Sequence, residues 1–399
     1  MNSESNNNIE RIDDEENTVI IQDSENTNNA QADNQPQAIA VKKKLPLSCK
    51  IIYIISALCV LLYALFVIFP SFSDFFNKYI SPSVRAVLAA LTGWIPFSLA
   101  EYLILLIPLI LVALVSFGIK YYGDSWRNVG VFCLIIFSLA AYIFSTFTVA
   151  FVPAYRGSRL DAKMGLDKQE VSTYDLMYTA IILSDQIKKE ADNISLDDNG
   201  SSVMPYGYDR MNDELMLAYD KVCAKYDFVQ SMDSKIKRVM LSEPMTYTHI
   251  SGVYTFFTGE ANLNTNFPDY TLPFTAAHEF AHQRGIARED EANFIAFLVC
   301  IESDDAYIRY SGYLNLFEHV ASALYSANPK YYASIYNDLP QKSKIEMAAY
   351  SNFFEKYKKT IISDVSGEWN DKFLTANGTE GTKSYGMVVD LAVAYYKQH

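Results

Sequence analysis

The sequence predicts a mainly α-helical membrane protein, in which three transmembrane helices precede a mostly helical α+β domain with a small sheet. Two observations predict this class. The chain has 399 residues, which is more than one hydrophobic core usually organises. Half of the residues are apolar although the net charge is -13, and a single soluble domain rarely combines the two. We therefore expect the apolar and the charged residues to be segregated along the chain.

The apolar residues gather in three uncharged segments, residues 51–69, 102–119 and 129–152. Uncharged runs of about 18 or more residues can cross the roughly 30 Å of hydrocarbon in a bilayer, so each segment predicts a transmembrane helix. A fourth apolar stretch, residues 86–100, is shorter and broken by glycine and proline, which favours an interfacial or re-entrant segment. Residues 1–48 are polar and rich in asparagine and acids, a composition typical of a disordered tail.

Basic residues beside the spans predict the orientation of the chain, because they mark cytoplasmic loops. Those before the first span and between the second and third are Lys42, Lys43, Lys44, Lys50, Lys120 and Arg127. Opposing them on the other side are Lys78, Arg85, Arg156 and Arg159. The majority predicts a multi-pass protein of the cell membrane with a cytoplasmic tail (1–48), a membrane domain (49–153) and an extracytoplasmic domain (154–399).

The extracytoplasmic domain is predicted to be helical around a short extended region. Ser172 and Thr173 precede an amphipathic pattern, as at the start of a helix, and further helices are expected at 214–226, 274–283, 290–301 and the chain end. Residues 248–273 carry aromatic and β-branched side chains around glycines, which indicates one or two strands. Five cysteines give no disulfide framework; a bridge between Cys223 and Cys300 is possible, but a buried free thiol is favoured.

The segment "AAHEFAHQRGIAREDEANF", residues 276–294, carries the chemistry. On a helix, His278 and His282 share one face and can both present a ring nitrogen to one Zn²⁺ ion. Glu279 lies about 100° around the helix, from where it can reach a water molecule on the metal and act as the general base. With only five histidines in the chain, two exposed histidines that merely pair with acids are the weaker interpretation. Gly285 suits the C-cap of this helix.

A catalytic zinc needs a third protein ligand and an open position for water. In the three-histidine version of the motif the ligand would stand at Arg288, which cannot bind a metal. The acids that follow are the alternatives. Glu291 is favoured because it shares a helical face with Ile295 and Leu298 and should point inward, and Glu302 and Glu289 are the other candidates.

The segment "EDEANFIAF" resembles the second active-site helix of glutamate-type zincins, in which the ligand glutamate precedes an alanine; the resemblance implies that Glu291 is the ligand. The chain also resembles an uncharacterised bacterial family, domain of unknown function 3810, in "ISGVYTFFTGEANLN", "LPFTAAHEFAHQRGIAREDEANF", "RYSGYLNL" and "SYGMVVDLA". Its members join three membrane spans to an extracytoplasmic zincin-like domain. The resemblance implies a zinc-dependent peptidase of the glutamate-type zincins and identifies no substrate.

Two further groups of residues are candidates for contacts with a substrate. Zincins run an edge strand along the peptide before the metal helix, and "GVYTFFTGEANLN" is placed to do so, with Glu260 and Asn264 as candidate contacts. A plain core strand is the equal alternative. A developing oxyanion needs a donor besides the metal, for which the candidates are Arg309, Tyr310, Tyr313 and His319.

The pattern predicts a membrane-anchored zinc metallopeptidase that acts on a peptide or protein at the cell surface. The alternative is a catalytically silent surface receptor or scaffold that keeps the zincin fold. An intact Glu279 argues against the alternative, because a structural metal site needs no general base. The acidic balance and the absence of nucleotide-binding glycine motifs give no reason to expect nucleic acid as a partner, and the oligomeric state is not predicted.

Overall fold

The computed structural model describes residues 11–14, 17–20, 41–358 and 360–399. The chain divides into two compact units, and each is described by itself. The span unit comprises Met1–Val60 and Ile104–Ser145, and the main body comprises Leu61–Leu103 and Thr146–His399. Residues 61–103, which the sequence assigned to a membrane domain, thus pack with the C-terminal part of the chain.

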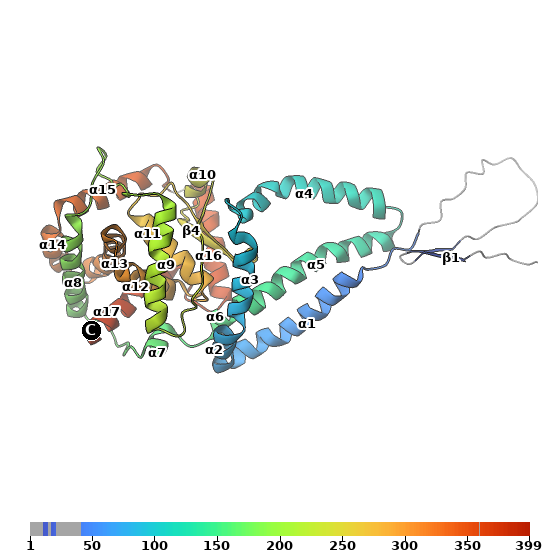
Figure 1. The fold of residues 1–399 in the computed structure, drawn as a ribbon, viewed down its shortest axis with the longest axis horizontal. Coiled ribbons are helices and arrows are strands. Elements are labelled where there is room, and N and C mark those ends of the chain that lie inside the picture. The colour runs from blue at the N-terminus through green and yellow to red at the C-terminus, as the bar shows by residue number, and fades with distance from the viewer. Residues whose placement is uncertain (1–10, 15–16, 21–40, 359) are drawn as a thin grey trace, which may run out of the picture. The chain divides into compact units, whose positions relative to one another are not determined.

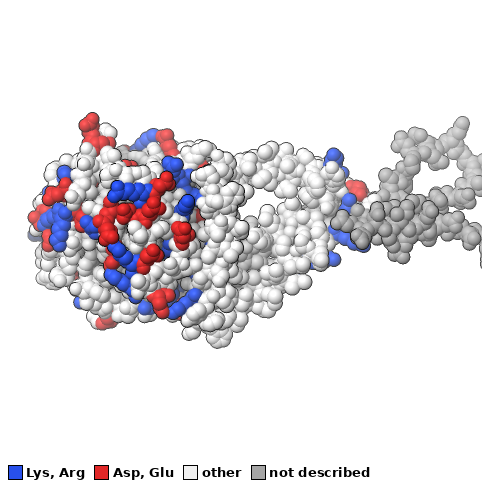
Figure 2. Space-filling view, in the orientation of Figure 1, with Lys and Arg blue, Asp and Glu red and all other residues white. Residues whose placement is uncertain are grey.

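Three helices in the described residues are long and apolar enough to cross a membrane: α1 (Leu47–Ile68), α4 (Leu99–Tyr122) and α5 (Trp126–Ala150). They coincide with the three predicted spans within a few residues. Charged side chains gather on the surface of the main body and are nearly absent along these helices (Figure 2). Most of the tail that was predicted to be disordered lies outside the described residues. Its described parts include a short antiparallel pair that the sequence did not predict, β1 (Arg11–Asp14) with β2 (Asn17–Ile20).

Short helices occupy the chain on either side of the second and third spans. Between the first two spans lie α2 (Pro70–Tyr79) and α3 (Ser81–Gly93), and after the third lie α6 (Val152–Arg156) and α7 (Leu160–Met164). The stretch 86–100, predicted to be interfacial or re-entrant, thus begins as helix α3. This helix packs on the turn between two strands, because a Cβ atom added at Gly259 would lie 2.7 Å from Leu88 Cβ.

The main body also contains a bundle of further helices (Figure 1). In chain order these are α8 (Thr173–Ala191), α9 (Tyr208–Lys225), α10 (Ser242–Thr246), α11 (Thr271–Gln283), α12 (Glu289–Glu302), α13 (Ala306–Ala327), α14 (Pro329–Asp338), α15 (Gln341–Glu355), α16 (Ile361–Ala376), the 3-10 helix η1 (Gly381–Met387) and α17 (Val388–Gln398). Helix α8 begins where predicted, with a capping box between Ser172 and Asp175. Helices α11 and α12 are buried along their lengths and pack on each other and on α9 and α13.

The small sheet has the strand order β3-β5-β4, with β3 at Lys237–Arg238, β4 at Gly252–Thr255 and β5 at Glu260–Leu263. Strands β4 and β5 confirm the extended region predicted at 248–273. They pair antiparallel, with Tyr254 opposite Ala261, whereas β3 runs parallel to β5. Strand β4 is therefore an edge of this sheet, and it packs on α11. Cys223 and Cys300 are both free thiols, of which Cys300 is buried.

Candidate metal centre and adjoining cavity

Helix α11 fixes the predicted motif in the interior of the main body. His278, Glu279 and His282 are all buried on it. Neighbouring positions are alanines, and their small side chains allow other elements to approach the helix closely. Tyr219 of α9 donates a hydrogen bond of 2.5 Å to the Ala277 carbonyl. The motif is therefore held on a helix that has little freedom to move.

The end of α11 confirms the C-cap predicted at Gly285. This residue has a φ of 85°, which disfavours any residue with a Cβ atom. The amide of Gly285 donates to the His282 carbonyl at 3.0 Å, and the amide of Ile286 donates to the Ala281 carbonyl at 3.0 Å. These two bonds form a Schellman motif, which turns the chain back so that the next helix begins beside the histidines.

Glu289, the first residue of α12, completes a cluster with the two histidines. Its Oε2 atom lies 3.1 Å from Nε2 of His278 and 3.4 Å from Nε2 of His282. All three side chains are buried, and their candidate ligand atoms lie within 4.8 Å of one another. Glu289 was a secondary candidate for the third ligand, and the structure brings it to the histidines.

Glu291 does not reach the cluster, so its favoured position as the third ligand is corrected. The side chain is buried, as its helical face predicted, but burial takes it to other partners. Its Oε1 accepts hydrogen bonds from the Leu160 amide at 3.0 Å and from Arg288 Nη1 at 3.2 Å. The other candidate, Glu302, lies at the opposite end of α12 and pairs with Lys225.

The donor set fits a Zn²⁺ ion of the two-histidine, one-carboxylate type. Nδ1 of His282 lies 2.8 Å from the Ile286 carbonyl, which can only accept, so Nδ1 carries a proton and Nε2 is the nitrogen that a metal could bind once it has released its own proton. Burial opposes protonation of His282, but the adjacent Glu289 carboxylate outweighs it and raises the pKa of the imidazole to about 9. The pKa of Glu289 is lowered by the histidines against the effect of burial. Without a metal, the chain concentrates charge at this point.

Glu279 projects beside the cluster toward edge strand β4. A Cβ atom added at Gly252 would lie 2.6 Å from its Oε1, so the strand backbone packs directly against the carboxylate. Its Oε2 is buried and has no hydrogen-bond partner among the described residues. Burial raises the pKa of Glu279 to about 6, although the two histidines oppose the shift. A carboxyl group with such a pKa can accept and release a proton near neutral pH.

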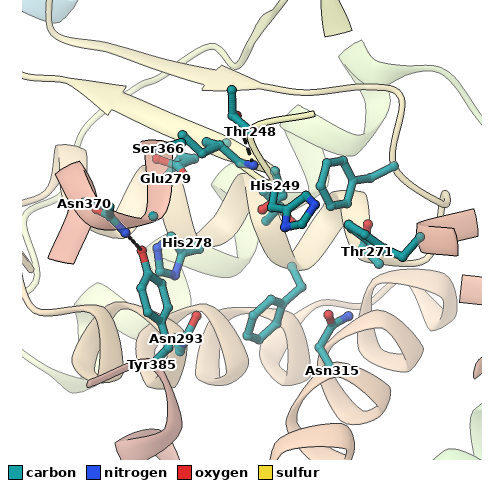
Figure 3. A pocket seen from close by; sticks show the side chains of 18 of the residues that line it. Thr248, His249, Thr271, His278, Glu279, Asn293, Asn315, Ser366, Asn370 and Tyr385 are labelled. Carbon is teal, nitrogen blue, oxygen red and sulfur yellow. Dashed lines mark hydrogen bonds between the residues drawn. The ribbon is translucent and has the colours of Figure 1, made fainter. Parts of the chain in front are cut away.

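A cavity of about 540 Å³ opens onto His278 and Glu279 (Figure 3). One part of its lining is aromatic, with Phe267, Phe274, Tyr350 and Phe354. Most of the other lining residues are polar, and they include Asn293, Asn315, His319, Ser366, Asn370 and Tyr385. Among the residues that the structure describes, Glu279 is the only carboxylate in the lining, which has no lysine or arginine.

Tyr385 and Asn370 lie at this site, and reasoning from the sequence missed both. Asn370 Nδ2 donates to the Tyr385 hydroxyl at 3.3 Å (Figure 3). Burial first, and the Glu289 carboxylate second, raise the pKa of Tyr385, so its hydroxyl stays protonated and can donate. The only signal in the sequence was the family-like segment "SYGMVVDLA", to which Tyr385 belongs but which carried no assigned role.

Of the four candidate oxyanion donors, only His319 lines the cavity. Burial lowers its pKa, so the ring is neutral. Arg309 forms an ion pair with Glu190 at 2.7 Å, and the Tyr310 hydroxyl donates to Glu346 at 2.8 Å; both are held away from the cavity by these partners. Tyr313 packs edge-on against Phe297, with ring centroids 6.0 Å apart.

The two candidate substrate contacts on the extended segment also have structural partners. Glu260 accepts hydrogen bonds from the amides of Leu99 and Ala100, both at 3.0 Å, and so caps the first turn of α4. Asn264 is buried and donates to the Ile250 carbonyl at 3.0 Å. Neither lines the cavity, because both side chains satisfy backbone groups instead.

Comparison with known proteins gives one family. The family described as "Protein of unknown function (DUF3810)" matches residues 76–393. This range includes the second and third candidate spans and the whole of the cluster and cavity. No curated protein matches the chain, and no solved structure matches it.

Proposed function

The chain belongs to the DUF3810 family, and from the geometry of its site we propose that it is a membrane-anchored, zinc-dependent metallopeptidase. One observation carries the proposal: His278, His282 and Glu289 converge on one point beside Glu279, at the end of a cavity. Two imidazoles and a carboxylate are the ligands of hydrolytic zinc sites. The unpartnered Glu279 oxygen supports catalysis over a purely structural site, since such a site needs no base.

In this proposal His278, His282 and Glu289 hold the zinc ion. When bound, the metal supplies Lewis acidity that polarises the peptide carbonyl and activates water. Glu279 accepts the proton of the attacking water and later delivers it to the leaving amine. Burial raises the pKa of Glu279 above its ordinary value in the metal-free chain, which favours a carboxylate that can take up a proton.

Tyr385 is better placed to act as the oxyanion donor than Arg309, Tyr310 or Tyr313, which the sequence suggested. Its hydroxyl is protonated, is held by Asn370 and belongs to the same cavity as Glu279. A donor fixed before the reaction stabilises negative charge on the carbonyl oxygen without reorganisation. We therefore assign Tyr385 as the oxyanion donor, with His319 as the second group of the cavity able to donate.

The peptide substrate is expected to lie along β4. This edge strand offers backbone groups for antiparallel pairing, and its first residue, Gly252, touches Glu279. The adjoining cavity would take one substrate side chain. Among the described lining residues, Glu279 is the only charged partner, so any other charged side chain of the substrate would be desolvated there without a partner of opposite sign. We therefore expect preferred substrates to place an uncharged polar or aromatic side chain in the cavity.

The three apolar helices are proposed to anchor the protein in the cell membrane, with the main body on the extracytoplasmic side. The substrate would then be a peptide or protein at the cell surface. This location follows from the basic residues near Lys42 and Lys120 and from the positive-inside rule.

The test uses the full chain in detergent, loaded with Zn²⁺ and incubated with a peptide library. E279Q should keep the zinc and lose about 100-fold or more in rate, because it removes the base and leaves the ligands. Y385F should also keep the zinc and lose about 100-fold in kcat. E302Q is the matched control, since Glu302 pairs with Lys225 away from the site. Cleavage by E279Q at the wild-type rate would refute the mechanism, and zinc binding without any cleavage would favour a silent scaffold.

A further inference from the structure

Helix α16 presents three different faces, and one of them is apolar and exposed. Along this face lie Ile361, Ile362, Val365, Trp369 and Phe373, which repeat with the period of a helix. Their exposed fractions include 84% for Ile361 and 73% for Trp369. A continuous exposed stripe of large apolar side chains marks an interaction surface more often than it is a neutral feature. We call these five residues the α16 stripe.

The other two faces of α16 have clear roles. Ser363, Ser366, Gly367 and Asn370 line the cavity next to Glu279. A third face is acidic and carries Asp364, Glu368 and Asp371, while Lys372 lies beside the α16 stripe and pairs with Glu368 at 2.6 Å. The helix is therefore a wall of the cavity, and the α16 stripe is a second, separate surface of that wall.

The C-terminal end of α16 is attached to the part of the main body where the candidate spans end. The Phe373 ring lies 6.1 Å from the ring of Phe147, which is in the last turn of α5. Arg156, just after that span, donates to the Ala376 carbonyl at 3.2 Å and to the hydroxyl of Tyr63, near the end of α1, also at 3.2 Å. If α1 and α5 cross a bilayer, these last turns lie at its boundary, and so does the end of the α16 stripe.

We propose that the α16 stripe inserts into the headgroup and acyl-chain boundary of the bilayer that holds the spans, so that its partner is lipid. Its aromatic residues, Trp369 and Phe373, are of the kind that suits a membrane interface. The helix carries three acids and one lysine, so apolar burial and not attraction to anionic lipid drives the contact. The membrane then supports a wall of the cavity, because Asn370 lies on the same helix. This inference rests on the proposed membrane anchoring and is independent of zinc or peptidase activity.

The experiment measures tryptophan emission of the full chain in vesicles of zwitterionic lipid, brominated in one preparation near the headgroup and in another near the end of the acyl chains. The chain has three tryptophans, so W94F/W126F leaves Trp369 as the only emitter. Two controls replace all three and add one tryptophan: L139W on α5 and L217W on α9, where the native leucines are 60% and 58% exposed. The native side chains at all five substituted positions are exposed, so folding should tolerate these substitutions.

Trp369 should lose roughly half of its emission to the lipid brominated near the headgroup and resist an aqueous quencher, as an interfacial side chain does. L139W, at the centre of α5, should be quenched by the lipid brominated deep in its acyl chains, and L217W should be quenched only from water. Adding anionic lipid should leave the result unchanged. Trp369 behaving like L217W while L139W is quenched would overturn the α16 contact alone. An unquenched L139W would overturn the anchoring as well. Protection of Trp369 from both quenchers would mean that a second protein copy covers the stripe, which also overturns the proposal.

Discussion

At the scale of single residues, the proposal of a third zinc ligand rests on one carboxylate oxygen. Glu289 Oε2 lies 3.1 Å and 3.4 Å from the two histidine nitrogens, whereas Glu291 is two residues away and bonded elsewhere. E289Q should weaken zinc binding about 100-fold or more, because an amide is a poor ligand for this ion. E291Q should bind zinc as the wild type does. Its free energy of unfolding should be lower by about 1–3 kcal/mol, because the substitution disturbs a buried hydrogen bond and an ion pair with Arg288.

Zinc content measured by competition with a chelator, together with thermal unfolding, separates the two variants. Loss of zinc from E291Q with retention by E289Q would reverse the assignment.

The positions of Glu289 and Glu291 also show what sequence periodicity can predict. It placed Glu291 inward correctly, but it could not show that the Leu160 amide, which is 131 residues away in the sequence, donates to this carboxylate beside the local partner Arg288. A helical face gives burial, and the partner depends on contacts far apart in sequence.

The raised pKa of Glu318 on α13 predicts that stability depends on pH. This dependence is separate from that of the candidate metal centre. Burial raises the pKa of this carboxyl to about 7, and a hydrogen bond from Tyr270 at 3.1 Å only partly offsets it. The unfolded chain ionises Glu318 near pH 4.5, whereas the folded chain keeps the proton until about pH 7. The contribution of Glu318 is therefore fully present below pH 4.5 and is lost as the pH rises to about 7.

E318Q should remove this dependence, because glutamine stays neutral and can still accept from Tyr270. The variant should equal the wild type in stability near pH 4.5 and exceed it by about 1–3 kcal/mol at pH 8. Thermal unfolding of both proteins across this range measures the difference, with E170Q as an exposed control that should show none. A constant difference between E318Q and the wild type at all pH values would contradict the raised pKa.

At the scale of elements, the turn after α11 ties the metal helix to helix α3. Gly285 has a φ of 85°, and a Cβ atom there would lie 2.6 Å from Cζ of Arg85. Arg85 is itself buried and bonded to the Asn77 side chain at 2.8 Å and to the Ala150 carbonyl at 2.9 Å, so it cannot move aside easily. The Asn77 amide also donates to the Gly285 carbonyl at 3.0 Å.

G285A should therefore lower the free energy of unfolding by more than the strain of a positive φ alone would. Gly165 offers a matched control, because its φ is 69° and an added Cβ would meet nothing within 4 Å. We expect G165A to lose about 1 kcal/mol and G285A to lose at least about 2 kcal/mol more, from strain and the displaced arginine. Thermal unfolding of both variants tests this. Equal losses would show that Arg85 does not lock the turn.

The helices and strands themselves were largely predictable, because local sequence signals mark where they begin and end. A capping box marks the start of α8, alternation of β-branched and aromatic residues marks β4, and the glycine after His282 marks the end of α11. The position of η1 could not be predicted in this way. Tyr385 stands more than one hundred residues after Glu279, and the cavity brings them together only through the packing of η1 and α16. No periodicity in the sequence records that contact.

At the scale of the whole molecule, the fold does not determine the orientation in the membrane, which is predicted from the positions of basic residues in the sequence. Four basic residues opposed the prediction, and the structure gives each of them a role in the main body. Lys78 pairs with Asp227 and Arg159 with Asp290, while Arg85 and Arg156 bond to backbone carbonyls. Their presence thus has a structural reason that is independent of orientation. The basic residues before α1 and around the α4–α5 loop retain the positive-inside interpretation.

Cysteine labelling of intact cells tests this orientation. A variant with all five cysteines replaced by alanine would carry one new cysteine, either Y121C beside the α4–α5 loop or Y325C on α13. Both tyrosines are exposed, with 47% and 57% of their surface accessible, so a thiol at either position can react. A membrane-impermeant maleimide should label Y325C on intact cells and Y121C only after the cells are opened. Labelling of Y121C on intact cells would place the main body in the cytoplasm, where a cell-surface substrate could not reach Glu279.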